Sequence, residues 1–225
     1  GKSGILVGSY DFYLHCISPE SGKPLWKVET ENFVNGTPAI SNGRVLFGGC
    51  DGILRIVNPL TGRQTDTINA GVYIASSPAI DFPYAYVGDY EGTFYKVDIS
   101  AGKMVWKKAA GSEGGSIMSI PSLSGNKVLI GSDDNNLYCF DSATGNTLWS
   151  FRTNGSVRGS PVIAGDKVLF GSNDGYIYIV GLNDGKRKWS FNCGSPVSST
   201  PAVTKNRFYV LTEEGRLIAF GVKQR

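Results

Sequence analysis

The chain is poor in the residues that usually carry catalysis or hold metals. Only one of its 225 residues, His15, is a histidine, so a Ser-His-Asp or Cys-His set cannot be built anywhere else. The four cysteines are nowhere adjacent and never form a Cys-x-x-Cys pair, so zinc-type sites lack ligands. They are Cys16, Cys50, Cys139 and Cys193. We therefore expect no catalytic residue and no metal site, and the redox state of the cysteines stays open.

Long apolar runs and a strong charge of one sign are also missing. No stretch approaches the roughly 18 consecutive apolar residues that a membrane-spanning helix needs. The 22 basic and 19 acidic residues give a net charge of +3, which is too near neutral for a protein that coats nucleic acid or binds anionic membranes. The chain begins Gly-Lys-Ser-Gly without methionine, so we expect a processed chain or a piece of a longer one.

Glycine and aromatic residues are abundant, and they recur at a fixed spacing. The chain has 30 glycines and 12% aromatic residues, a composition typical of short strands joined by tight turns. A glycine closes an apolar run at Gly8, Gly48, Gly88, Gly131 and Gly171, in steps of 40, 40, 43 and 40. The same rhythm places prolines at Pro38, Pro78, Pro121, Pro161 and Pro201. Such self-similarity indicates a repeat architecture.

Each repeat is predicted to form four antiparallel strands. In the fourth repeat these strands are expected at residues 119–123, 127–131, 137–141 and 147–151. The connections are short and rich in Gly, Asn, Asp and Ser, which indicates hairpins. The third strand is apolar on both faces, as at Leu54, Ile56 and Val57, and this is typical of a strand buried on both sides. The pattern predicts an all-β fold, a β-propeller of four-stranded antiparallel blades, as a single domain over residues 1–225.

The number of blades follows from the strand count. The second and third strands occur six times and the first and fourth five times, which gives 22 strands. We expect about six blades, with three-stranded blades at the two ends of the chain. The alternative is an arc of a larger ring, which would expose apolar blade faces.

The repeat resembles the quinoprotein-type repeat, also called the PQQ-like repeat, over nearly the whole chain. The resemblance rests on residues 168–180 (VLFGSNDGYIYIV), 184–189 (DGKRKW) and 141–149 (DSATGNTLW), and on Ser160-Pro161. It implies that a tryptophan near the end of the repeat docks between neighbouring blades. These tryptophans are Trp26, Trp106, Trp149 and Trp189, whereas the second repeat has Asp66 at this position.

The resemblance also bears on activity and location. Enzymes of this family hold a quinone cofactor with a disulfide between adjacent cysteines, a tryptophan floor and a calcium ion. This chain has no adjacent cysteines, and its tryptophans are accounted for by docking. The chain is therefore similar to the non-enzymatic branch, which includes the periplasmic lipoprotein of outer-membrane barrel assembly and sensor domains attached to kinases. The resemblance implies no enzyme activity, no cofactor, and an extracytoplasmic location, either periplasmic or at the cell surface.

One position varies inside an otherwise constant segment of the repeat. Four residues before each repeat proline stands a branched apolar residue: Val34, Ile74, Ile117, Val157 or Val197. The next position holds Asn35, Ala75, Met118, Arg158 and Ser198. Because this segment enters the innermost strand, we expect these five side chains to ring one mouth of the central channel, as a binding funnel with Arg158 as its charge. A water-filled mouth with no specific role is the alternative. Phe33 and Tyr73, just before the apolar row, are candidate contacts on the propeller face.

Three functions compete at this point. The first is a non-catalytic scaffold that binds a protein or peptide partner through a propeller face. The second is a small-molecule or PQQ-binding domain of a quinoprotein dehydrogenase. The third is a sensor domain excised from a larger kinase or membrane protein. We favour the scaffold and expect neither a nucleic-acid partner nor a membrane span, while the partner's identity and the oligomeric state stay open.

Overall fold

The computed structural model describes residues 4–74, 76–111 and 114–221. Over these ranges the chain forms 22 strands, every pairing is antiparallel, and no helix occurs, so none could cross a membrane. The strands belong to two compact units, residues 1–109 and 110–225. The single domain over residues 1–225 stays a prediction.

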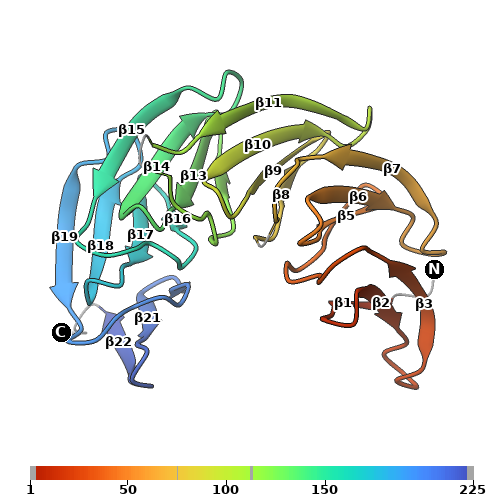
Figure 1. Ribbon diagram of the computed structural model, residues 1–225. Coiled ribbons are helices and arrows are strands. Elements are labelled where there is room, and N and C mark those ends of the chain that lie inside the picture. Colours follow the sequence, from red (N-terminus) through yellow and green to blue (C-terminus); the bar gives the residue numbers. More distant parts are fainter. Residues whose placement is uncertain (1–3, 75, 112–113, 222–225) are drawn as a thin grey trace. The chain divides into compact units, whose positions relative to one another are not determined.

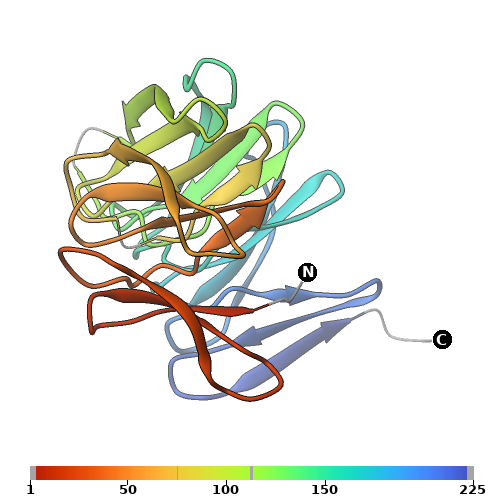
Figure 2. The ribbon, with the colours of Figure 1, turned by 90° about the vertical axis from the view of Figure 1, so that its right-hand side faces the viewer.

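The first unit contains three sheets, whose strands follow one another in chain order (Figure 1, and turned by 90° in Figure 2). The first sheet has β1 (Ile5–Gly8), β2 (Tyr13–Ile17) and β3 (Pro24–Glu29). The second has β4 (Ala39–Ser41), β5 (Arg44–Gly48), β6 (Ile53–Val57) and β7 (Gln64–Asn69). The third has β8 (Ala79–Asp81), β9 (Tyr84–Gly88), β10 (Thr93–Asp98) and β11 (Lys103–Ala109).

The second unit repeats this construction with its short sheet at the other end. The fourth sheet has β12 (Ser122–Ser124), β13 (Lys127–Gly131), β14 (Asn136–Asp141) and β15 (Thr147–Arg152). The fifth has β16 (Val162–Ala164), β17 (Lys167–Gly171), β18 (Tyr176–Gly181) and β19 (Arg187–Asn192). The sixth has β20 (Ala202–Val203), β21 (Arg207–Leu211) and β22 (Leu217–Gly221). The predicted 22 strands, with three-stranded sheets at both ends, are thus confirmed over the described residues.

The predicted start of the innermost strand is wrong by three residues. We expected that strand of the fourth repeat to begin at Ser119, but β12 begins at Ser122. Pro121 has no N–H to donate to a ladder. Ser119 pairs through its side chain instead: its Oγ accepts the Gly131 N–H at 2.8 Å and donates to the Gly131 carbonyl at 3.0 Å. A hydroxyl thus replaces the first rung of the sheet.

The cores lie on the faces of the third strands, as predicted. Leu54, Ile56 and Val57 of β6 are 0% exposed, and Cys139 of β14 is 0% exposed in the place of such an isoleucine. In the three-stranded end sheets burial is less complete, and Leu217 of β22 is 70% exposed. The middle strands of the four-stranded sheets therefore carry most of the packing.

Close packing explains why the repeat glycines recur. Val34 is 2% exposed, and a Cβ added to Gly8 would lie 2.5 Å from its carbonyl oxygen. A Cβ at Gly48 would lie 2.5 Å from Cγ2 of Ile74, which is 0% exposed. No side chain fits at such distances, so within each unit these glycines and branched apolar residues interlock between successive sheets.

Candidate interaction face

The turns between the second and third strands, here called the rim turns, form one edge of each sheet. They comprise residues 9–12, 49–52, 89–92, 132–135, 172–175 and 212–215. Each of the last five lies against the segment that enters its own sheet. The Cys50 N–H donates to the Phe33 carbonyl at 2.8 Å, and the Tyr90 N–H donates to the Tyr73 carbonyl at 3.0 Å. The candidate face contacts Phe33 and Tyr73 therefore lie directly beside the rim turns, and we use the word rim for the turns together with these neighbouring residues.

An aspartate holds most rim turns by contacting a side chain of the third strand. The partner is His15 for Asp11, Arg55 for Asp51, Tyr138 for Asp134 and Tyr178 for Asp174, at 2.6–2.8 Å. Burial and the hydrogen bond to Asp174 raise the pKa of Tyr178, so its phenol stays neutral. His15 thus fills a structural position that tyrosine and arginine fill in other repeats.

The Asp51–Arg55 pair is the most buried of these contacts. Arg55 donates Nη1 to Oδ1 at 3.1 Å and Nη2 to Oδ2 at 2.7 Å, and the two side chains are 6% and 4% exposed. Burial acts to raise the pKa of Asp51, but hydrogen bonds from Arg55 and from the N–H groups of Glu31 and Ile53 hold it below its usual value. The pair stays ionised and fixes the second rim turn.

Phe12 occupies a backbone conformation that suits glycine. Its φ is +73°, and the same rim-turn position holds Gly52, Gly92, Gly175 and Gly215 at φ between +76° and +87° and Asn135 at +72°. A bulky residue in the left-handed region costs free energy that glycine does not pay. The side chain of this strained residue is nevertheless 43% exposed, so burial alone does not explain why phenylalanine stands here.

The Phe12 ring belongs to an exposed aromatic cluster. Its centroid lies 5.3 Å from the Phe33 ring, and the Tyr10 ring meets Phe33 edge-on at 4.7 Å. Tyr10 is 70% and Phe33 38% exposed. Farther along the same rim, Tyr73 and Tyr90 are both 55% exposed. The rim of the first unit thus presents large aromatic side chains to solvent.

The rim of the second unit has a different chemistry at equivalent positions. Ser116, Ser156 and Pro196 stand where the first unit has Phe33 and Tyr73. Asp133, Asn173 and Glu213 stand where it has Tyr10, Cys50 and Tyr90. A constant scaffold thus carries an aromatic rim in one unit and a polar, acidic rim in the other.

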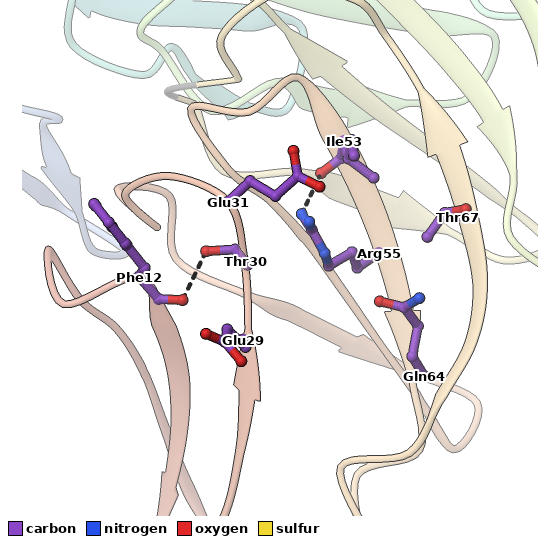
Figure 3. Close-up of a pocket in the computed structure, with 8 residues that line it drawn as sticks. All are labelled: Phe12, Glu29, Thr30, Glu31, Ile53, Arg55, Gln64 and Thr67. Atoms are coloured by element: carbon purple, nitrogen blue, oxygen red, sulfur yellow. Dashed lines mark hydrogen bonds between the residues drawn. The ribbon is translucent and has the colours of Figure 1, made fainter.

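A groove adjoins the aromatic cluster, between the first and second sheets (Figure 3). Its volume is about 660 Å³, and it is lined by Phe12, Glu29, Thr30, Glu31, Ile53, Arg55, Gln64 and Thr67. Figure 3 shows Phe12, Glu29 and Thr30 on one side and Arg55, Gln64 and Thr67 on the other. The Thr30 hydroxyl donates to the Phe12 carbonyl at 2.8 Å, which ties the end of β3 to the first rim turn.

The predicted funnel residues are placed as follows. Asn35 is exposed and its Nδ2 lies 3.3 Å from the Cys50 Sγ, Met118 is 38% exposed, and Ser198 is half-buried. Arg158 pairs with Asp133 through Nε–Oδ1 at 2.8 Å and Nη2–Oδ2 at 3.0 Å, so its charge is balanced. Ala75 lies outside the described residues. A binding role for this row stays a prediction.

Two of the predicted docking tryptophans contact the next sheet through a hydrogen bond. Trp26 Nε1 donates to the Pro59 carbonyl, and Trp149 Nε1 donates to the Leu182 carbonyl, both at 3.1 Å. Trp189 packs against Phe208 and Phe220 of the next sheet, whereas the contacts of Trp106 with Tyr86 and Phe94 lie within its own sheet.

The second repeat makes the equivalent contact with different residues. Asp66 replaces the tryptophan. Ile99 occupies the position equivalent to Pro59, and its carbonyl accepts a hydrogen bond from Arg44 Nη1 at 2.5 Å. Arg44 and Asp66 line a notch of about 270 Å³ beside this contact. A guanidinium thus takes the place of the indole N–H.

The cysteines are buried and free. All four are buried thiols, and burial raises the pKa of Cys139 to about 12. Burial also raises the pKa of Cys16, Cys50 and Cys193. Within the described ranges no group of three or more His, Cys, Asp or Glu side chains could hold a metal ion. These thiols behave as small core hydrophobes.

Comparison with known proteins identifies the repeat. A family model described as "Outer membrane protein assembly factor BamB" matches residues 2–66 and 51–224. The chain belongs to this family. Its PQQ-like repeats and their propeller-type blades, predicted from the sequence, are thereby confirmed.

Individual relatives are distant. The chain is 27% identical over 127 residues to BamB of Francisella tularensis, a match that covers 52% of this chain and 27% of the relative. It is 29% identical over 133 residues to the beta-alanine-activating enzyme of Drosophila melanogaster, covering 56% of this chain and 13% of that enzyme. The matched stretches thus span less than a third of either relative.

Solved structures agree on the fold. BamB from Moraxella catarrhalis superposes with a TM-score of 0.83 at 18% identity, covering 97% of this chain and 70% of that one. The computationally designed Ika8 protein superposes with a TM-score of 0.84 at 17% identity, covering 98% and 69%. At these identities the likeness concerns the fold alone.

Sequence reasoning named Phe33 and Tyr73 but missed Tyr10 and Phe12. A signal for Phe12 was present in the repeat alignment. The first repeat has phenylalanine where four others have glycine and one has asparagine. A residue that breaks turn chemistry at an exposed position is a candidate for function.

Proposed function

We propose that the chain is a non-catalytic protein-interaction scaffold that binds a partner protein through the aromatic rim of its first unit. The observation that carries this proposal is the exposed cluster of Tyr10, Phe12 and Phe33, which contains a ring held at φ +73°. Tyrosine and other aromatic residues are enriched where protein interfaces gain most of their affinity. Exposed aromatic patches of this kind mark interaction sites.

The family supports a scaffold over an enzyme. The family model and the Francisella relative are both named as an outer membrane protein assembly factor. The enzyme-named relative matches over only 13% of its length. By the same analogy we propose a location outside the cytoplasm, in the periplasm or at the cell surface.

Affinity capture with matched variants tests the scaffold and its face. The native chain and the variants Phe33→Ser and Arg158→Glu are used as baits in a native lysate. Phe33→Ser introduces serine, the residue that the second unit has at the equivalent position 156. The proposal predicts a partner that is retained by the native chain and by Arg158→Glu and lost with Phe33→Ser. Loss with Arg158→Glu alone would move the site to the predicted funnel. If the native chain retains no partner, the scaffold function is contradicted.

A further inference from the structure

The groove of Figure 3 carries an excess of negative charge. Its lining includes three charged side chains, Glu29, Glu31 and Arg55. Arg55 is neutralised by its bidentate pair with Asp51. Within residues 4–74 and 76–109, no cation pairs with Glu29 or Glu31, and both side chains are exposed. The groove therefore has a net charge of about −2 at neutral pH.

Among residues 4–74 and 76–109, the cations nearest these carboxylates have other contacts. Asp11 is paired with His15 at 2.8 Å. The Lys27 ammonium lies 3.8 Å from the centroid of the Tyr13 ring, to which it is attracted. Glu29 and Glu31 are thus exposed carboxylates without an ion pair among residues 4–74 and 76–109.

Phe12 joins this acidic groove to the aromatic cluster. Phe12 is one of the residues that line the groove, where its carbonyl faces Thr30, while its ring extends away from the other lining residues (Figure 3) and lies 5.3 Å from the Phe33 ring. A ligand that lies in the groove and extends past Phe12 would therefore meet carboxylates and then the rings of the aromatic cluster. Carboxylates attract ammonium and guanidinium groups, and aromatic rings bind both cations and apolar side chains.

We infer that this groove, with the aromatic cluster beside it, binds a basic segment of the partner protein that carries an aromatic or large apolar residue between lysines or arginines. The inference rests on the proposed scaffold function and adds the chemistry of the partner. The basic groups pair with Glu29 and Glu31, and the apolar residue packs on Phe12 and Phe33. The strain at Phe12 is retained because its ring forms the centre of this site.

Fluorescence anisotropy with a defined probe tests the inference. The probe is the fluorescein-labelled peptide Gly-Lys-Val-Lys-Phe-Lys-Val-Lys-Gly, compared with one version in which glutamate replaces every lysine and one in which serine replaces the phenylalanine. The full chain is expected to bind the first peptide, more weakly as salt rises, and to bind each altered peptide at least about tenfold more weakly. No saturable binding of the first peptide below about 1 mM would overturn the inference.

Variants of the chain locate the binding. Glu29→Gln with Glu31→Gln is expected to weaken binding about five- to tenfold at low salt, because two exposed charge pairs are lost. Phe12→Gly is expected to weaken it at least about tenfold. The matched control, Glu213→Gln with Glu214→Gln on the acidic rim of the second unit, is expected to leave binding unchanged. Equal weakening by the control would overturn the assignment to this groove.

Two outcomes separate this inference from the function on which it rests. If the basic peptide fails to bind but Phe33→Ser still loses a captured partner, the partner's chemistry is wrong and the scaffold stands. If the chain instead self-associates in sedimentation velocity and Phe12→Gly makes it monomeric, a second copy occupies the site and the inference is overturned.

Discussion

Replacing Phe12 by glycine separates a binding role from a structural one. The left-handed conformation at φ +73° costs a non-glycine residue about 1–2 kcal/mol, and glycine removes that cost. Against this, a ring that is 43% exposed loses about 1 kcal/mol of burial and about 0.5–1.5 kcal/mol of contact with Phe33. Greater freedom of glycine in the unfolded chain costs about 0.5–1 kcal/mol more. The gain offsets roughly half of these costs, so Phe12→Gly should lower the free energy of unfolding by about 1 kcal/mol and by no more than about 2.5 kcal/mol.

Phe12→Ala is the control, because it removes the ring and keeps a Cβ in the strained conformation. It should be less stable than Phe12→Gly by about 1 kcal/mol, although alanine is otherwise the more stabilising residue. Urea unfolding of the native chain and both variants measures these differences. A loss of about 3 kcal/mol or more in Phe12→Gly would show that the ring is needed for the fold, and equal stability of the two variants would show that the turn is not strained.

Three further predictions concern the packing and the buried groups. Gly131→Ala should lower stability by about 2 kcal/mol or more, because its methyl would lie 2.5 Å from the Val157 Cγ1; an unchanged melting temperature would contradict the packing described here. Asp51→Asn should cost about 3–5 kcal/mol at neutral pH because it leaves the Arg55 charge buried. Since the pKa of Asp51 is lowered in the folded chain, this stabilisation exists above the unfolded pKa and disappears as the pH falls through the folded one. The difference between native chain and variant should therefore shrink in acid, and a constant difference would refute the pairing. The Cys139 thiol, with its pKa near 12, should react with a thiol reagent only after unfolding, whereas fast reaction in native buffer would contradict its burial.

The sheets were predictable because the sequence pattern of each strand and turn recurs in several repeats. Comparison of the repeats showed the positions that they share, such as Gly8, which packs closely against Val34, and Trp26, whose Nε1 donates to the Pro59 carbonyl. The first strand was placed too early because a hydroxyl, which periodicity does not register, satisfies the backbone of Gly131.

Features that depart from the frame were harder to interpret. Asp66 was visible as a missing tryptophan, but Arg44, which makes the replacement hydrogen bond, lies 22 positions earlier in the chain, and only the fold brings the two residues to one notch. The strain at Phe12 depends on the φ angle of a single residue, which a hydrophobic pattern does not reveal. The acidic groove was not predictable either, because its lining comes from β3 and β7, which belong to neighbouring sheets.

Site-specific photo-crosslinking in living cells tests whether a partner protein binds the aromatic rim of the first unit. A photoreactive phenylalanine analogue is placed at Phe33, and in a matched chain at Ser156, the equivalent position of the second unit. We expect a crosslinked partner protein from position 33 and none from position 156. Crosslinking from position 156 alone, or from both positions equally, would contradict an interaction face on the aromatic rim.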